Sequence, residues 1–136
     1  MVQLYRIETP QPVPQPDFSD AEAGAMQRAV IRLFDLWGLT DRQAAVLLGD
    51  ISERTYARWK DGQYGRVSRD LAARLSNLMG IHKALRLLFS EAARTYAWVK
   101  KPNSDFGGRS ALEVMLNGNL TDLMRIRRYL DAQRSL

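Results

Sequence analysis

Cysteine is absent from the 136-residue chain, and histidine occurs once, as His82. Without thiols there is no disulfide framework, no thiolate metal site and no cysteine nucleophile. One imidazole with no carboxylate at ligand spacing makes neither a metal site nor a catalytic set, so His82 is expected at the surface or at a helix end. We therefore expect the protein to bind no metal.

Long apolar runs are also missing. No stretch reaches the ~18 consecutive apolar residues of a membrane-spanning helix, and the N-terminus lacks the basic and then apolar segments of an export signal. There is no paired-carboxylate loop, no nucleophile with a base beside it, and no glycine-rich phosphate cradle beyond the weak pair Gly107 and Gly108. These absences favour a cytoplasmic protein without a membrane partner, and an enzyme or a cofactor-binding protein is the least supported class.

The composition is that of a globular protein, with 46% hydrophobic and 26% charged residues. After residue 20, apolar residues recur at helical spacing rather than in alternation, so an all-α fold is predicted, with one ordinary core or two small ones. The formal net charge of +5 favours a polyanionic partner, although many modestly basic proteins bind none.

The stretch 39–59 has the spacing of two short helices joined by a tight turn. Thr40 and Gln43 form a capping box for the first helix, and Gly49 ends it at positive φ. Ser52 caps the second helix, whose inner face carries Tyr56 and Trp59. This pattern predicts a helix-turn-helix.

The outer face of the second helix carries Glu53, Arg54, Thr55, Arg58 and Lys60. A single α-helix fits the major groove of B-DNA, an arginine fork matches the O6/N7 pair of guanine, and free N–H groups at helix N-termini suit phosphate oxygens. We therefore predict that the chain binds double-stranded DNA with Arg54 and Thr55 as base readers. The predicted DNA-binding residues are Thr40, Gln43, Ser52, Glu53, Arg54, Thr55, Arg58 and Lys60. Two helices joined by a glycine turn also occur in all-α cores that bind no nucleic acid.

The remaining segments are predicted from proline, capping residues and apolar spacing. Four prolines between positions 10 and 16 make residues 1–18 an extended arm. Ser19 caps a helix that runs to Gly38, and Ser68 caps a long helix that Gly80 either bends or ends. A short helix over 90–98 is expected to present four residues to the core, namely Ala93, Tyr96, Ala97 and Trp98.

A glycine-containing loop and two further helices close the chain. Pro102 blocks helix continuation, Ser110 and Glu113 start a short helix, and Gly118 ends it. We expect Trp98 in the core and Phe106 as an aromatic anchor at an interface. The last helix begins near Thr121, and its arginines are expected mostly on one outer surface: Arg125, Arg127, Arg128 and Arg134.

Two parts of the sequence resemble known families. The residues Gln43, Ala45, Gly49, Ser52, Thr55, Arg58 and Trp59 are spaced as in the Xre/Cro-type helix-turn-helix family, except that Asp50 and Ile51 lengthen the turn by one residue. The C-terminal half resembles the toxin-binding domain of the Xre/MbcA/ParS antitoxin family in Trp98, Pro102, Asn103, the run from Gly107 to Glu113, Gly118, Tyr129 and Leu130.

The resemblance implies an antitoxin that forms a homodimer, neutralises a cognate RES-domain toxin by covering its active-site entrance, and represses its own operon. RES toxins are associated with NAD⁺ consumption. Since guanidinium groups pair with carboxylates or occupy phosphate sites, arginines of the antitoxin could occlude a pocket that binds this dinucleotide. The predicted toxin-binding residues are Asn103, Phe106, Arg109, Arg125, Arg128 and Arg134. The expected division is an arm over 1–18, a DNA-binding domain over 19–67, and a toxin-binding and dimerisation domain over 68–136.

Two other functions fit the same residues. One is a plain transcriptional repressor whose C-terminal half dimerises or senses a ligand. The other is a partner-binding inhibitor whose helix-turn-helix is purely structural.

Overall fold

The computed structural model describes residues 19–135, whose secondary-structure elements are all helices, as predicted, apart from an isolated antiparallel bridge between Pro102 and Ser110. The arm expected over residues 1–18 lies outside the described residues. Within them, no helix is long and apolar enough to cross a membrane. The seven α-helices are α1 (Asp20–Leu36), α2 (Asp41–Leu47), α3 (Glu53–Lys60), α4 (Arg69–Leu88), α5 (Ala92–Ala97), α6 (Ala111–Met115) and α7 (Leu120–Arg134), and two 3-10 turns are η1 (Trp98–Lys100) and η2 (Ser104–Phe106).

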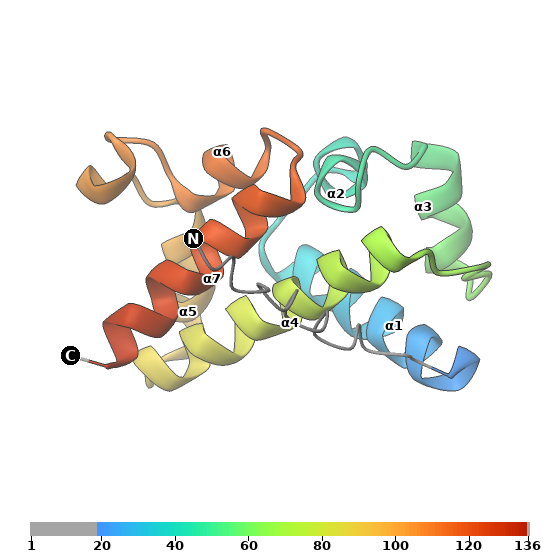
Figure 1. Ribbon diagram of the computed structural model, residues 1–136, viewed down its shortest axis with the longest axis horizontal. Helices are drawn as coiled ribbons and strands as arrows, with labels where there is room; N and C mark the ends of the chain where they lie inside the picture. Colours follow the sequence, from blue (N-terminus) through green and yellow to red (C-terminus); the bar gives the residue numbers. More distant parts are fainter. Residues whose placement is uncertain (1–18, 136) are drawn as a thin grey trace, which may run out of the picture.

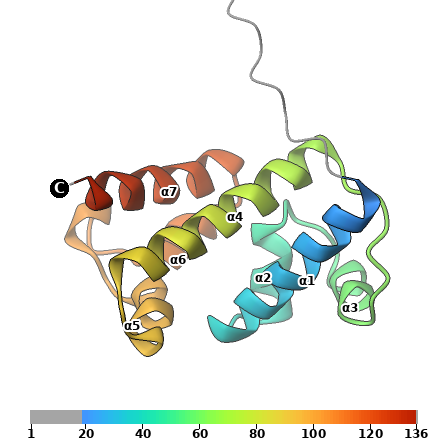
Figure 2. The same cartoon turned by 90° about the horizontal axis from the view of Figure 1, so that it is seen from below.

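The long helix α4 lies at the centre of the molecule. It packs against α1 on one side and α7 on the other, and both figures show α1 to α3 gathered at one end of it and α5 to α7 at the other (Figures 1 and 2). Gly80 neither bends nor ends α4, which runs unbroken for 20 residues. A Cβ at Gly80 would lie 2.5 Å from Nε of Arg127, so glycine lets the Arg127 side chain of α7 lie directly against α4.

The five predicted capping residues each cap a helix. The oxygens of Ser19, Thr40, Ser52, Ser68 and Ser110 each accept a hydrogen bond from the backbone N–H three residues later. The capping boxes predicted at Thr40 and Ser110 are both complete. Since each cap satisfies donors that the helix leaves unpaired, these residues fix where the helices begin.

The short helix α5 differs from its prediction. Ala93 and Ala97 are exposed, whereas Thr95 and Val99 are buried. Thr95 and Val99 are four residues apart, so the face turned to the core is the one that carries them, and the α-helix gives way to the 3-10 turn η1 between them. Thr95 tolerates burial because its hydroxyl donates to the carbonyl of Glu91, at 3.1 Å.

A single continuous core joins the two ends of the molecule. Phe34 and Leu47 from the first end, Leu78 and Ile81 from α4, and Ile126 from α7 belong to one cluster of buried side chains. Every long helix therefore contributes to one packed interior, and α4 is shared between its two ends.

Candidate functional site

Helix α3 is held on α1 and α2 by its aromatic residues. Tyr56 and Trp59 are buried, and the ring of Tyr56 lies 6.4 Å from both Phe34 and Trp59, measured between centroids. Tilted aromatic pairs of this kind stabilise beyond their buried area. The inner face of α3 is thus fixed, as the sequence predicted, and its outer face is free.

That outer face carries the predicted base readers. Glu53, Arg54, Ala57 and Arg58 are exposed. At about 100° per residue, Arg54 points almost directly away from the buried pair, with Arg58 beside it. Among the described residues, neither arginine makes an ion pair. Thr55 is half-buried, and its Oγ1 accepts a hydrogen bond from the Ser52 hydroxyl at 2.8 Å.

Lys60 has a contact that the sequence did not reveal. Its Nζ lies 2.7 Å from Oδ1 of Asp41, and 5.4 Å above the ring of Tyr56. The ion pair joins the end of α3 to the start of α2. Lys60 therefore positions α3, and a phosphate would compete with Asp41 for its ammonium group.

The Tyr56 hydroxyl stays protonated at neutral pH. Burial, followed by the nearby carboxylates of Asp41 and Asp35, raises the pKa of Tyr56 to about 12.

The lengthened turn is accommodated by two left-handed residues. Gly49 has φ of 93° and Asp50 has φ of 61°, and Asp is among the few non-glycine residues that adopt this conformation readily. Arg74 of α4 holds the turn from beneath: its Nη1 donates to the carbonyl of Leu47 at 3.3 Å, and its Nε donates to Asp70 at 2.8 Å. The extra residue is thus absorbed before Ser52 starts α3.

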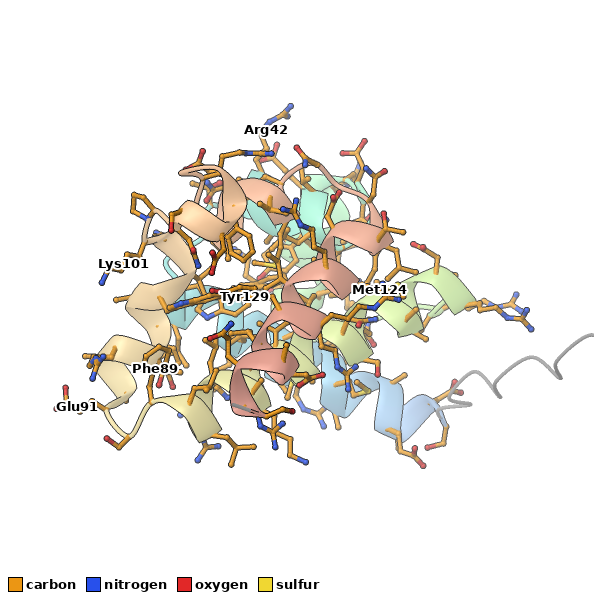
Figure 3. The ribbon with its side chains drawn as sticks, turned by 60° about the vertical axis from the view of Figure 1, so that its left-hand side comes forward. Arg42, Phe89, Glu91, Lys101, Met124 and Tyr129 are labelled. Atoms are coloured by element: carbon orange, nitrogen blue, oxygen red, sulfur yellow. The ribbon has the colours of Figure 1, made fainter. Side chains whose placement is uncertain are left out.

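Two contributors to this surface were missed. Gln27 is fully buried, and its Nε2 donates to the carbonyl of Tyr64 at 3.0 Å, which fixes the loop after α3. Arg42, in the first turn of α2, extends from the top of the molecule into solvent (Figure 3). The sequence could have identified Arg42 as a phosphate-binding candidate, because it follows the helix cap Thr40 by two residues and free N–H groups at a helix N-terminus bind phosphate.

At the other end of the molecule, three aromatic rings form a cluster. Phe106 meets Tyr129 edge-on at 4.8 Å and Trp98 at 6.3 Å between centroids, and Trp98 stacks on Tyr129 at 6.2 Å. The expected place of Phe106 was wrong, and Trp98 packs against the core but is only partly buried. Phe106 is only 5% exposed, with Arg125 5.5 Å above its ring, whereas Trp98 is partly exposed. The η2 turn folds Phe106 inward, so Trp98 and Tyr129 form the accessible part of the cluster.

Polar contacts rigidify the loop beside this cluster. The Tyr129 hydroxyl donates to Oδ2 of Asp105 at 2.6 Å, and Asn103 donates to the same hydroxyl at 3.5 Å. The bond to Asp105 raises the pKa of Tyr129, while the contact with Asn103 opposes that shift. Arg109 donates to the carbonyl of Glu113 at 2.9 Å and to Asn117. Asn103 and Arg109 therefore hold the loop in place besides any role in binding a partner.

The four arginines of α7 do not share one surface, contrary to expectation. Arg125 lies over Phe106, whereas Arg127 lies against Gly80 of α4, about 200° away around the helix. Arg128 is exposed on the outer side, and Arg134 is 3.7 Å from Asp131. Arg125 and Arg128 lie about 60° apart around the helix, whereas Arg127 and Arg134 lie close together on the opposite side, so Arg125 and Arg128 form the basic part of this outer face.

Across residues 19–135, no group of three His, Cys, Asp or Glu side chains is placed to hold a metal ion. The two candidate surfaces described above are an exposed helix with unpaired arginines at one end of the described structure, and an aromatic and basic face at the other.

Comparison with protein families assigns both ends. Residues 19–80 match the antitoxin Xre-like helix-turn-helix domain, and residues 84–135 match the antitoxin Xre/MbcA/ParS C-terminal toxin-binding domain. The chain is also similar to the uncharacterized protein y4oB of Sinorhizobium fredii (strain NBRC 101917 / NGR234), with 40% identity over 119 residues, which cover 88% of this chain and 92% of that protein. Both domains are regulatory binding domains of antitoxins rather than enzymes. The chain therefore belongs to the family of toxin–antitoxin antitoxins that join a DNA-binding Xre-like helix-turn-helix domain to an Xre/MbcA/ParS toxin-binding domain.

Proposed function

We propose that this antitoxin binds a palindromic operator in its own promoter as a homodimer, and that it neutralises a RES-type, NAD⁺-consuming toxin. The DNA-binding part of this proposal depends on the two faces of α3. Arg54 and Arg58 are exposed and unpaired among the described residues, while Tyr56 and Trp59 lock the same helix into the core. Base reading requires side chains on a rigid element, and α3 is one.

In the proposed complex, α3 enters the major groove. Arg54 pairs with guanine O6 and N7, Thr55 meets a neighbouring base, and Arg42 with the N-termini of α2 and α3 binds phosphates. One helix-turn-helix reads only a few base pairs, so two copies would read half-sites about one helical turn apart. An insertion of about five base pairs between the half-sites turns them to opposite faces of the duplex and should abolish tight binding.

The test is fluorescence anisotropy with labelled duplexes of the antitoxin's own promoter and of a scrambled sequence. Arg54→Ala should cost about 1–3 kcal/mol on the promoter and much less on the scrambled duplex. Arg32→Ala, which removes an exposed arginine of α1, is the charge-matched control and should preserve the preference for the promoter. Equal losses on both duplexes for Arg54→Ala would refute its base-reading role.

The toxin half of the proposal rests on the outer face of α7. Arg125 and Arg128 are exposed beside the partly exposed rings of Trp98 and Tyr129. Guanidinium groups suit the phosphate sites of a pocket that binds a dinucleotide, and aromatic rings with arginines are typical anchors of protein interfaces. We therefore assign this face to the entrance of the toxin's active site.

The corresponding experiment measures cellular NAD⁺ when the toxin encoded in the same operon is induced. Co-expression of the antitoxin should restore NAD⁺, and Arg128→Ala should restore less than the control Arg69→Ala, an exposed arginine at the start of α4. A toxin that leaves NAD⁺ unchanged in the absence of antitoxin would exclude the RES assignment.

A further inference from the structure

An open groove lies between the outward face of α4 and the flank of α7. Its volume is about 570 Å³, within the size range of ligand-binding clefts. Met79, Gly80, Lys83, Arg86 and Leu87 line it from α4, and Arg127 lines it from α7. This groove belongs neither to the face of α3 nor to the face of α7 that carries Arg125 and Arg128.

The groove follows one stripe of α4. Position 76, the pair 79 and 80, position 83 and position 87 follow one another at steps of three or four residues, on the side of the helix opposite the buried stripe that contains Leu78, Ile81 and Leu85. Leu87 is 57% exposed, and it is one of two large hydrophobic side chains that lie exposed within residues 19–135, the other being Leu36. At the floor of the groove Gly80 lets the Arg127 guanidinium lie across α4. The stripe thus offers apolar contact beside positive charge.

The charge of the groove is of one sign. Lys83, Arg86 and Arg127 line it, no carboxylate does, and none of the three takes part in an ion pair within the described part of the chain. A second copy of the antitoxin placed on this groove about a two-fold axis would set these cations against their equivalents, which is unfavourable. An acidic partner would neutralise them instead.

We propose that the groove between α4 and α7 is a second docking surface for the toxin, and that it receives an amphipathic toxin segment with an apolar side chain flanked by carboxylates. The apolar side chain would contact Met79 and Leu87, and the carboxylates would pair with Lys83, Arg86 and Arg127. The proposal rests on the toxin partnership proposed above. The groove borders α7 on one side and Arg125 lies on the other, so a single toxin molecule over α7 reaches both surfaces.

Charge reversal tests the proposal. The variant Lys83→Glu/Arg86→Glu is compared with Arg32→Glu/Arg69→Glu, which changes the net charge equally at exposed positions away from the groove. Affinity is measured by biolayer interferometry between immobilised antitoxin and the cognate toxin. The groove variant should bind at least ~10-fold more weakly, and the control should bind like wild type. Thermal unfolding and promoter binding are measured in parallel to show that both variants fold.

The outcomes separate the two proposals. Equal affinity of the groove variant and wild type would refute the groove while leaving the toxin partnership intact. Failure of wild-type antitoxin to bind the toxin would refute the partnership itself, and the assigned occupant of the groove with it.

A photocrosslinking residue at position 87 gives an independent test, because it reports contact directly and does not depend on weakening the complex. Crosslinks from Leu87→p-benzoyl-phenylalanine in the intact complex should map to an acidic segment of the toxin. The same substitution at Leu36, the other exposed leucine, is the control and should give no such product. Crosslinks from position 87 to a second antitoxin chain, or none to the toxin, would overturn the proposal.

Discussion

Arg74 links the helix-turn-helix to the central helix, and its replacement by methionine tests that role. The residue is only 7% exposed, and it donates both to the Leu47 carbonyl at the end of α2 and to Asp70, one turn earlier on α4. Methionine keeps most of the apolar stem but removes both donors. The Leu47 carbonyl then loses this buried partner, whereas the Asp70 side chain is 58% exposed and is rehydrated by water.

The expected loss follows from these two contacts. A hydrogen bond from a charged donor to a buried carbonyl contributes about 1.5–3 kcal/mol, and the 3.3 Å length of this one favours the lower end of that range. The ion pair with an exposed carboxylate adds about 0.3–0.5 kcal/mol. Arg74→Met should therefore lower the free energy of unfolding by about 2 kcal/mol, and the melting temperature by roughly 7 °C for a chain of this size.

Thermal unfolding followed by circular dichroism, at equal protein concentrations, measures this change. Asp70→Asn removes the ion pair and the carboxylate in the first turn of α4 but keeps the bond from Arg74 to Leu47, so as the matched control it should lower the melting temperature by about 2–4 °C, less than Arg74→Met. Buried charged groups are in some proteins replaced by apolar ones without loss of stability. If Arg74→Met melts within 2 °C of wild type, the Leu47 carbonyl does not depend on Arg74, and the account of how the turn is held is wrong.

Three further substitutions test local features. Gly49→Ala should destabilise by about 1–3 kcal/mol in urea unfolding, because φ is 93° there and a Cβ would lie 3.1 Å from a guanidinium nitrogen of α4. Gly80→Ala should leave the melting temperature nearly unchanged, since about 1 kcal/mol of helix propensity offsets displacement of the flexible Arg127 side chain; a large fall would refute this. Burial, then Arg86, lowers the pKa of His82 below 6.5, so the unfolded chain binds the proton more readily. The free energy of unfolding should therefore fall as the pH drops below 6.5, because protonation of His82 favours the unfolded chain. This fall should be smaller in His82→Gln, and urea unfolding at successive pH values measures it.

The local features of the fold were predictable from the sequence. A serine or threonine cap depends on a hydrogen bond to a residue three positions away, so Ser19, Thr40, Ser52, Ser68 and Ser110 each mark a helix start without knowledge of the rest of the chain. The exposure of Arg54 was also predictable from local spacing. Once Tyr56 and Trp59 define the inner face of α3, the 3.6-residue period fixes its outer face.

Features that depend on which helices meet were not predictable. The burial of Phe106 depends on a 3-10 turn that directs it under Arg125, and no spacing rule distinguishes its ring from that of Trp98. The role of Gly80 was equally hidden, because a glycine within a helical pattern has the same local signature whether it bends the helix or admits a neighbour such as Arg127. Both depend on contacts between distant segments.

The unbroken course of α4 limits how the two proposed binding surfaces can influence each other. Arg74 in its first half supports the helix-turn-helix, and Leu87 in its second half borders the groove, while the buried stripe between them belongs to one core. A toxin that occupies the C-terminal surfaces therefore meets no hinge within α4 through which to rotate α3 away from DNA. Any effect on operator affinity would come from the toxin's own bulk and charge beside the duplex or from the spacing of two antitoxin copies, and by linkage DNA would change toxin affinity by the same factor.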